Sequence, residues 1–455
     1  MAPQILARAE HTVSRKGIDP DAIKVLYRLK KHGFLAYLVG GGVRDLLVGR
    51  KPKDFDVGTD AHPAQVKKLF RNCFIVGRRF RLCHIRFGQN VIEVSTFRCQ
   101  ALPESGDTLI RRDNTFGTPE QDAFRRDFTV NALFYDIATF SVIDHVGGLA
   151  DLEQRVIRTI GDPAVRFRED PVRMLRAVAL AARLDFSIDP DTLEAIRFLR
   201  SDIVRSSPHR ILEELYKILR QGAARKTFEM LHATGLLVYL MSEAEGALAR
   251  DGQALLDSLA RLDEYRNAGL VSPGELTNSL LLGSLLVPLK VSLRRVPMAR
   301  PVARDEPGEG HPEPDEEPLD VAAEIAALGG GEADEPADAP GQLAAPIELP
   351  FARRDLDRIR LMLTAQRRLR DLGSSPSAKH TLAGRGYFGE ALRWMEIHGG
   401  IEGRELALHW RSLDQYPDLE KPARASEPAS SRAKPERPSP RRRRRRRRPP
   451  APSKA

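Results

Sequence analysis

Apolar and polar residues follow two different periods in the first third of the chain. From Asp21 to Lys31 the pattern, with IKVLYRLKK at its centre, places apolar side chains at helical spacing, and Gly33 marks the predicted end of that helix. Residues 34–40, FLAYLVG, are apolar as in a buried strand. Shorter patterns predict helices at 43–49 and 63–70 and strands at 54–59, 73–77, 82–88 and 91–98. This mixture predicts an α+β domain over 25–145 with a small mixed sheet, preceded by an irregular lead-in, 1–24.

Beyond this domain the pattern becomes helical. Polar residues 100–124 carry few periodic apolar positions and predict a loop, whereas DPVRMLRAVALAARL (170–184) and HRILEELYKILRQG (209–222) predict helices. Helical patterning continues weakly to about residue 298 and returns at DLDRIRLMLTAQRRL (355–369). We therefore expect all-helical regions, which we name here by residue range: a neck at 146–222, a body at 223–300 and a C-terminal region at 346–420.

Two segments have compositions that cannot form a packed core. Residues 301–345 are rich in Pro, Gly, Ala and acids, and 305–345 hold 13 acids and no Lys or Arg. Residues 421–455 hold 14 Lys or Arg and 2 acids, a net charge of +12. We expect both to be disordered. The rest of the chain carries a net charge of +11, so the folded part is basic without its tail and indicates a polyanionic partner, most simply nucleic acid.

Other features of composition exclude several classes of protein. No run of about 18 apolar residues is present, which argues against a membrane span. The first residues, MAPQILARAEHTVSRKG, lack the apolar core of a secretory signal. Cys73, Cys83 and Cys99 fit neither a disulfide framework nor a zinc site. We therefore expect a cytoplasmic protein with reduced thiols.

The first motif that carries chemistry is GGGVRD (40–45) followed by DFD (54–56). A strand, a glycine turn at Gly40 and Gly41 and a short helix let a phosphate approach backbone N–H groups, and Arg44 adds a charge. Asp54 and Asp56 are expected on one face of a strand. Paired carboxylates in a basic setting fit Mg²⁺ bound to substrate phosphates. The alternative is a surface strand with two solvated acids.

The identity of a third carboxylate stays open between two candidates. Glu93 lies among apolar residues in a strand expected beside 54–59, where shared metal ions would neutralise it. Asp127, in RRDFTVNA (125–132), competes for that place or orients the nucleotide ribose. Arg126, Asp127 and Asn131 are also candidates for binding triphosphate and sugar. The structural alternative is that Asp127 caps a helix.

A further motif, EDPVRMLR (169–176), opens the long predicted helix. Asp170, Arg173 and Arg176 fall on one side of it and have the donors and acceptors to read a nucleobase edge. The alternative is an ion pair between Asp170 and Arg173 that supports the helix.

Taken together and in this order, these motifs resemble those of the class II nucleotidyltransferases, which comprise bacterial poly(A) polymerases and CCA-adding tRNA nucleotidyltransferases. The resemblance is strong over about 25–220 and implies a palm-like catalytic domain followed by helical neck, body and tail regions. It implies that Asp54 and Asp56 bind metal, with Glu93 and Asp127 as further acids of the site. It also places Arg126, Asp127 and Asn131 at the nucleotide, and Asp170, Arg173 and Arg176 near its base.

Three segments resemble the poly(A) polymerase branch more than the CCA-adding branch. They are HTVSRKGIDPDAIKVLYRL (11–29), IVGRRFRLCHI (75–85) and RRDNTFGTPEQDAFRRDFTVNALFYD (111–136). The Arg-rich C-terminus agrees with them. The acidic insert does not resemble the family, and no HD-type metal motif is evident.

The expected activity is polynucleotide adenylyl transfer from ATP to RNA 3′ ends with Mg²⁺ in a two-metal site. The alternatives are a CCA-adding enzyme and a non-catalytic RNA-binding protein. Expected partners are single-stranded RNA 3′ ends, with RNA-degradation proteins as candidates, no membrane, and a monomeric state. Residues proposed to hold the RNA backbone are Arg441, Arg442, Arg443, Arg444, Arg445, Arg446, Arg447 and Arg448. The alternative for this tail is a role in solubility.

Overall fold

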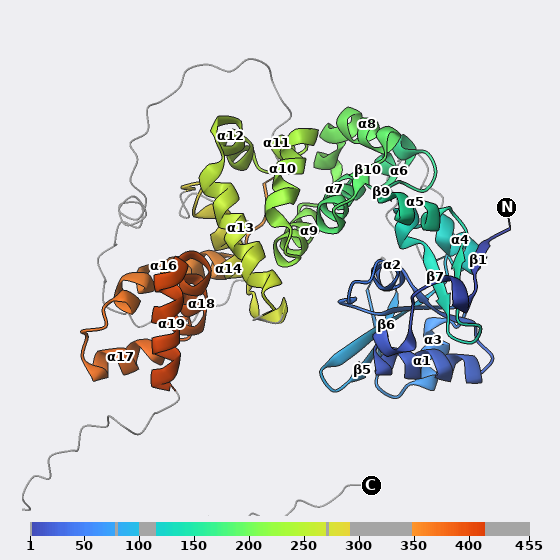
Figure 1. Cartoon of the computed structure of the whole chain (residues 1–455), viewed down its shortest axis with the longest axis horizontal. Helices are drawn as coiled ribbons and strands as arrows, with labels where there is room; N and C mark the ends of the chain where they lie inside the picture. The colour runs from blue at the N-terminus through green and yellow to red at the C-terminus, as the bar shows by residue number, and fades with distance from the viewer. Residues whose placement is uncertain (1, 78–80, 100–114, 270–272, 292–347, 415–455) are drawn as a thin grey trace, which may run out of the picture.

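The structure is a computed structural model, and it describes residues 2–77, 81–99, 115–269, 273–291 and 348–414. It forms an elongated arc with a sheet domain at one end and helices at the other (Figure 1). The predicted α+β class is confirmed. The predicted acidic insert 301–345 and the tail 421–455, with Arg441 to Arg448, lie outside the described residues.

An eight-stranded mixed sheet forms the first domain. Its order is β1-β8-β7-β2-β3-β6-β5-β4. Only β3 and β6 pair in parallel, and the other neighbours are antiparallel. The strands are β1 Gln4–Leu6, β2 Ala36–Val39, β3 Asp56–Thr59, β4 Cys73–Val76, β5 Leu82–Phe87, β6 Asn90–Thr96, β7 Leu133–Asp136 and β8 Ser141–Asp144.

The sheet is larger than the sequence pattern suggests, and the prediction of an irregular lead-in over 1–24 is wrong. Strand β1 pairs with β8 at one edge of the sheet, and helix α1 already begins at Pro20. The Asp19 side chain caps α1 by accepting from the backbone N–H of Asp21 at 2.7 Å. Strand β1 has only three residues and a mostly exposed pattern, so hydrophobic periodicity carried no signal for it.

One face of the sheet is buried under α1 and α3, and the other face is left for the site. Helices α1 (Pro20–Lys31) and α3 (Pro63–Leu69) contact the strands, and both helices lie beside the sheet in Figure 1. Val57 of β3 and Val94 of β6 are buried in the same core as α1. Because neighbouring residues of a strand point to opposite faces, Asp56 and Glu93 project away from α1 and α3.

The predicted loop over 100–124 is wrong for its last part. Residues 100–114 lie outside the described residues, but Pro119–Phe124 forms helix α4. Thr118 and Gln121 form a capping box at its start, with Thr118 Oγ1 accepting from Gln121 N–H at 3.2 Å. The capping pair was visible in the sequence, but six residues are too few for an apolar period.

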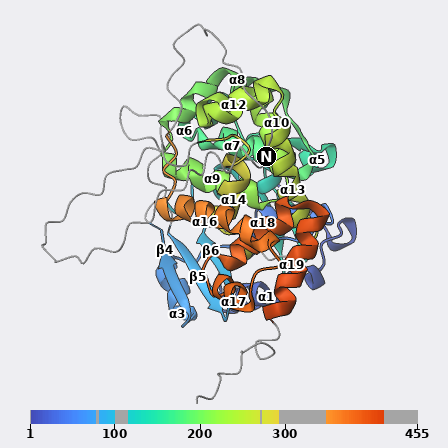
Figure 2. The same ribbon diagram turned by 90° about the vertical axis from the view of Figure 1, so that its left-hand side faces the viewer.

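The remaining described chain is helical apart from a short parallel pair, β9 (Val156–Ile157) and β10 (Ser187–Ile188). The C-terminal helices pack on α14 through α16 and form the end of the molecule nearest the viewer in Figure 2. The helices are α2 Gly41–Leu47, α5 Gly148–Gln154, α6 Pro163–Glu169, α7 Val172–Leu184, α8 Pro190–Leu199, α9 Pro208–Arg220, α10 Ala224–Thr234, α11 Leu237–Leu240, α12 Ser242–Arg250, α13 Gln253–Asn267, α14 Asn278–Leu286, α16 Arg353–Arg370, α17 Pro376–Ala383, α18 Phe388–His398 and α19 Gly400–Asp414. None of the helices in the described ranges is both long and apolar enough to cross a membrane.

Candidate nucleotide-binding site

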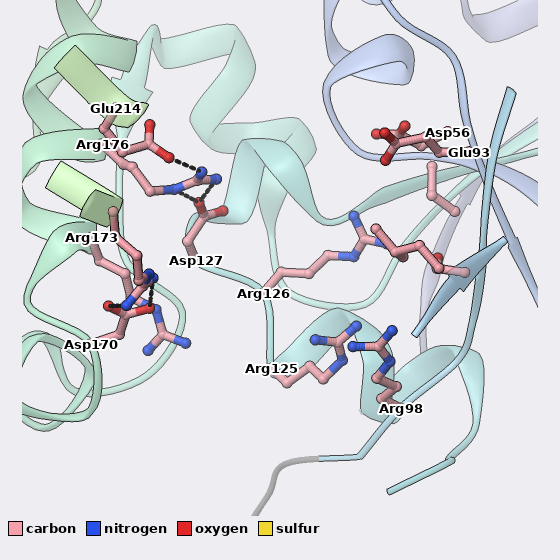
Figure 3. A pocket seen from close by; sticks show the side chains of 14 residues that line it. Asp56, Glu93, Arg98, Arg125, Arg126, Asp127, Asp170, Arg173, Arg176 and Glu214 are labelled. Carbon is pink, nitrogen blue, oxygen red and sulfur yellow. Dashed lines mark hydrogen bonds and ion pairs between the residues drawn. The ribbon is translucent and has the colours of Figure 1, made fainter. Parts of the chain in front are cut away.

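A charged pocket lies between the open face of the sheet and the first helices of the neck. Its volume is about 370 Å³, and Figure 3 shows its side chains converging from both sides. It brings together seven of the residues predicted from sequence: Asp56, Glu93, Arg126, Asp127, Asp170, Arg173 and Arg176. The remaining lining residues are Val39, Leu82, Ser95, Arg98, Arg125, Arg210 and Glu214.

The sheet wall of the pocket carries two adjacent carboxylates. Asp56 and Glu93 are register partners across the parallel strands β3 and β6, and in Figure 3 they lie side by side. Burial and the charge of Glu93 raise the pKa of Asp56 to about 6, against the opposing charge of Arg126. His84 Nε2 on β5 lies 3.4 Å from the Glu93 carboxylate.

The position of Asp54 differs from the predicted one. Strand β3 begins at Asp56, so Asp54 precedes it, and the expectation of two acids on one face of a strand is not met. The Asp54 side chain is 72% exposed and lies 3.6 Å from Lys53 Nζ. Its charge still contributes to the raised pKa of Asp56, so the two carboxylates remain electrostatic neighbours.

The carboxylates fit a divalent cation by their chemistry. Neighbouring carboxylates repel one another and are stabilised by a shared cation, and carboxylate oxygen is the ligand that Mg²⁺ prefers. In the described part of the chain, however, no three His, Cys, Asp or Glu side chains are already gathered as a metal site. Asp54, which is exposed and lies two residues from Asp56, is the acid whose carboxylate is free to adjust.

The glycine turn lies against this wall. Gly40 has φ +71°, and a Cβ there would lie 3.1 Å from Arg126 Nη1 and 3.9 Å from Asp56 Oδ2. Only glycine combines this backbone conformation with that close approach. Gly41 is the first residue of α2, and a Cβ on it would lie 3.1 Å from Arg44 Nη2.

The prediction that Arg44 contacts a phosphate directly does not agree with its position. Arg44 is 4% exposed and is absent from the pocket lining. Its guanidinium donates to Asp45 at 2.7 and 2.8 Å and to the side-chain oxygen of Asn131. It therefore ties α2 to the turn that carries Asn131, and Asn131 is likewise outside the lining.

The predicted helix start at Asp127 is a single 3₁₀ turn, Thr129–Asn131, and its N-cap residue is Phe128. Asp127 Oδ1 accepts from the N–H of Phe128 at 2.9 Å and from Asn131 Nδ2 at 3.0 Å. Its Oδ2 accepts from Arg176 at 2.6 and 3.0 Å. Burial alone would raise the pKa of Asp127, but Arg176 and Asn131 together hold it well below its usual range.

The neck wall of the pocket is built from paired charges. Arg210 on α9 binds both oxygens of Asp170, at 2.9 and 2.8 Å. Arg173 donates to Glu169 and to the backbone carbonyl of Arg166, both at 3.1 Å. Arg176 also reaches Glu214 at 3.4 Å. Sequence reasoning missed Arg210 and Glu214, because only the tertiary packing of α9 on α7 brings them here.

A third group, the arginines at the base of the pocket, was only partly foreseen. Arg98, Arg125 and Arg126 line the pocket together, and Figure 3 shows Arg98 beside Arg125. Only Arg126 was predicted as a site residue. The missed signal is local, because Asp122 stands three and four residues before Arg125 and Arg126, the spacing of ion pairs along a helix.

Comparison with known proteins agrees with this geometry. Residues 36–158 match the family model described as the Poly A polymerase head domain. Residues 185–248 match the one described as the Probable RNA and SrmB-binding site of polymerase A. The first match covers all the sheet residues of the pocket. The second covers helices α8 to α11, and so includes Arg210 on α9.

Curated relatives divide into two groups. Poly(A) polymerase I of Salmonella typhimurium is 48% identical over 264 residues, covering 56% of this chain and 57% of the relative. Poly(A) polymerase I of Escherichia coli O6:H1 is 52% identical over 236 residues, covering 50% and 51%. A CCA-adding enzyme of Bacillus pumilus is 38% identical over 216 residues, covering 47% and 53%. The chain thus spans about half the length of the curated relatives it matches.

Among solved structures, the CCA-adding enzyme of Bacillus stearothermophilus in complex with CTP is similar. It has a TM-score of 0.56 and 25% identity, and the match covers 88% of this chain and 84% of that one. The matched part of the chain is therefore similar to the Poly A polymerase head domain, to poly(A) polymerases and to CCA-adding enzymes.

Proposed function

We propose that this protein is a polynucleotide adenylyltransferase that adds AMP from ATP to RNA 3′ ends. In this reaction the RNA 3′-OH attacks the α-phosphate of ATP and pyrophosphate leaves. The observation that carries the proposal is the pocket, where a carboxylate pair, a group of arginines and a set of paired polar side chains meet. The choice of poly(A) addition rests on relatives named Poly(A) polymerase I, which are 48% identical over 264 residues and 52% identical over 236 residues.

The arginines at the base of the pocket suit the triphosphate. Arg98, Arg125 and Arg126 lie on the pocket side that faces Asp56 and Glu93. Guanidinium groups bind phosphate oxygens through two parallel hydrogen bonds, which fixes orientation as well as charge. The turn at Gly40 leaves room beside Arg126, where any larger residue would intrude. These groups would hold the β- and γ-phosphates and leave the α-phosphate beside the carboxylates.

Asp54, Asp56 and Glu93 would hold Mg²⁺. A bound divalent cation supplies charge neutralisation at the phosphates and lowers the pKa of a bound hydroxyl group. Of the two candidates for the third carboxylate, Glu93 is favoured because it is the register partner of Asp56. Asp127 is engaged by Arg176 and Asn131, which suits a role in positioning the nucleotide rather than in binding a cation.

The neck wall would receive the base. Asp170 offers carboxylate acceptors and Arg173 offers guanidinium donors, and each is held in place by a neighbour, Arg210 and Glu169 respectively. Side chains fixed in this way present a defined pattern of donors and acceptors, so a base with the complementary edge is favoured. With no template strand, this pattern is the source of nucleotide choice.

RNA is the proposed second substrate, bound as a single-stranded 3′ end. The match of residues 185–248 to a model described as a probable RNA-binding site supports this, as does the net charge of +10. The helical region at 346–420 and the arginines at 441–448 are proposed to add contacts to the RNA backbone. A cytoplasmic monomer that works beside RNA-degradation proteins remains part of the proposal.

The second candidate is CCA addition to tRNA. The specific observation in its favour is the likeness over most of the chain to a CCA-adding enzyme solved with CTP. The test is to give the purified protein an unstructured RNA or a tRNA lacking its CCA end, with Mg²⁺ and either ATP or CTP. Poly(A) addition predicts a ladder with ATP alone on both RNAs. Extension that needs CTP and stops after a few nucleotides on tRNA would establish the second candidate, and no extension with retained RNA binding would favour a non-catalytic protein.

A further inference from the structure

Asp122 lies directly behind the arginines of the pocket and has no role in the proposed chemistry so far. It is on α4, and its side chain is 1% exposed. It is absent from the pocket lining, so it cannot touch a nucleotide there. A buried aspartate is costly unless it is fully hydrogen-bonded, so its partners explain its presence.

The partners of Asp122 are the arginines themselves. Oδ1 accepts from Nε and Nη2 of Arg125 at 2.9 and 2.7 Å. Oδ2 accepts from Nε and Nη2 of Arg126 at 3.2 and 2.9 Å. The backbone N–H of Arg98 also donates to Oδ1, at 3.2 Å. One carboxylate therefore binds all three arginine residues that line the base of the pocket.

This arrangement answers a physical difficulty. Guanidinium groups placed together repel one another, and long side chains lose rotamer freedom when they are held still. Each oxygen of Asp122 binds the Nε and Nη2 edge of one arginine, a geometry that fixes the guanidinium plane. Burial alone would raise the pKa of Asp122, but Arg126 and Arg125 lower it overall, so the anion is present at neutral pH.

We propose that Asp122 is a positioning residue that holds Arg125 and Arg126 in the orientation that binds the triphosphate. The inference rests on the proposed function only for the identity of the ligand, a nucleoside triphosphate. It differs from a purely electrostatic role in the sign of its effect. Removing an anion makes the pocket more positive, which by charge alone would strengthen triphosphate binding. Loss of positioning would weaken it.

The test is binding of ATP and of AMP, with Mg²⁺ and without RNA, by titration calorimetry on the full chain carrying Asp122→Asn. We expect ATP affinity to fall on the order of tenfold or more, the scale of one hydrogen bond to a charged group. AMP affinity should change by less than about threefold, because AMP lacks the β- and γ-phosphates and its base lies at the neck wall. The ratio of the two dissociation constants is therefore the readout, and it does not require RNA extension to be observed.

The matched control is Asp151→Asn. Asp151 is also a buried aspartate, 5% exposed, that binds an arginine, Arg158 at 3.1 Å, but it lies outside the pocket lining. Its ATP-to-AMP ratio should stay as in the unmodified protein. Unchanged or tighter ATP binding by Asp122→Asn would overturn the proposal, and so would an equal loss of ATP and AMP affinity. If the Asn variant does not fold, Asp122→Glu keeps the charge, shifts both oxygens by one methylene, and is judged by the same ratio.

Discussion

Glu93→Gln should abolish most nucleotide addition and yet leave the protein as stable as before or slightly more stable. The side chain keeps its shape and loses its charge, which is the second cause, after burial, of the raised pKa of Asp56. A pKa of about 6 in the fold, against 3.8 in the unfolded chain, means that ionised Asp56 costs the folded state at most about 3 kcal/mol. The effect of Glu93 is smaller than that of burial, and its side chain is 47% exposed, so solvent screening reduces its share to about 1 kcal/mol or less.

The sign of this effect follows from proton linkage. Since the folded pKa of Asp56 is raised, the cost is absent below about pH 4, grows up to about pH 6 and is constant above that. At pH 8, Glu93→Gln should therefore raise the free energy of unfolding by up to about 1 kcal/mol. Single-turnover extension of an RNA primer with ATP and Mg²⁺ should slow by about 10²-fold or more, as for other losses of charge stabilisation in an ordered site.

The comparison variant is Asp127→Asn, which acts by a different route. It removes one partner of the Asp127–Arg176 ion pair, whose aspartate side chain is 12% exposed while the arginine is 41% exposed. We expect it to lower the free energy of unfolding by about 2 kcal/mol, below the usual cost for a fully buried pair. Near-normal extension by Glu93→Gln, or a large loss of its stability in urea, would refute the reasoning that Glu93 serves function at the expense of stability.

Three further predictions concern residues around the pocket and in the C-terminal helices. Arg44→Met should lower the free energy of unfolding by about 3 kcal/mol in urea, because it leaves the buried carboxylate of Asp45 with only the longer contact to Arg183 at 3.5 Å. Gly40→Ala should lower the free energy of unfolding by about 1–3 kcal/mol, because φ is +71° there. It should also raise the apparent KM for ATP, because the new Cβ would displace Arg126, and an unchanged KM would contradict this. Burial, with a smaller effect of Arg261, lowers the pKa of His398 to about 3. The neutral imidazole therefore contributes fully to stability above about pH 6.5, and up to about 2 kcal/mol of the free energy of unfolding should be lost between there and pH 5. His398→Gln should remove that part of the pH dependence of unfolding in urea.

The fold was predictable where a single element carries a clear period. Helix α1 is an example, with its Asp19 cap, Pro20 at the first turn and Ala22, Val25, Leu26 and Leu29 on one buried face. Strand β1 and helix α4 were missed because three and six residues are too few to show a period. Strand β1 is held by β8, far along the chain, and α4 by the backbone N–H of Arg98, which donates to Asp122 24 residues later.

The site was predictable where the chemistry is written in adjacent residues. Asp56 was foreseen from the DFD pair that follows the glycine turn, and Glu93 from a single charge in an apolar strand expected beside it. Arg44 and Asn131 were assigned to the ligand because donors and acceptors look alike in a sequence, whether they face a substrate or each other. Their mutual hydrogen bond shows that part of a polar motif can serve to hold the fold together. Arg210 was invisible for the opposite reason, since its partner Asp170 is 40 residues away.

The distribution of charge within the pocket shows which part of a nucleotide suits each wall. On the neck wall, Asp170 is bound to Arg210, Arg173 to Glu169, and Arg176 to Asp127 and Glu214, so charge is balanced pair by pair. Such a surface offers hydrogen bonds without a strong field, which suits an uncharged base. On the sheet wall, Asp56 lies beside Glu93, whose charge helps to raise the pKa of Asp56. Arg125 and Arg126, opposite them, share the single carboxylate of Asp122. The pocket therefore keeps a negative side and a positive side apart, and a triphosphate with a bound divalent cation, as in the proposed function, would complement both.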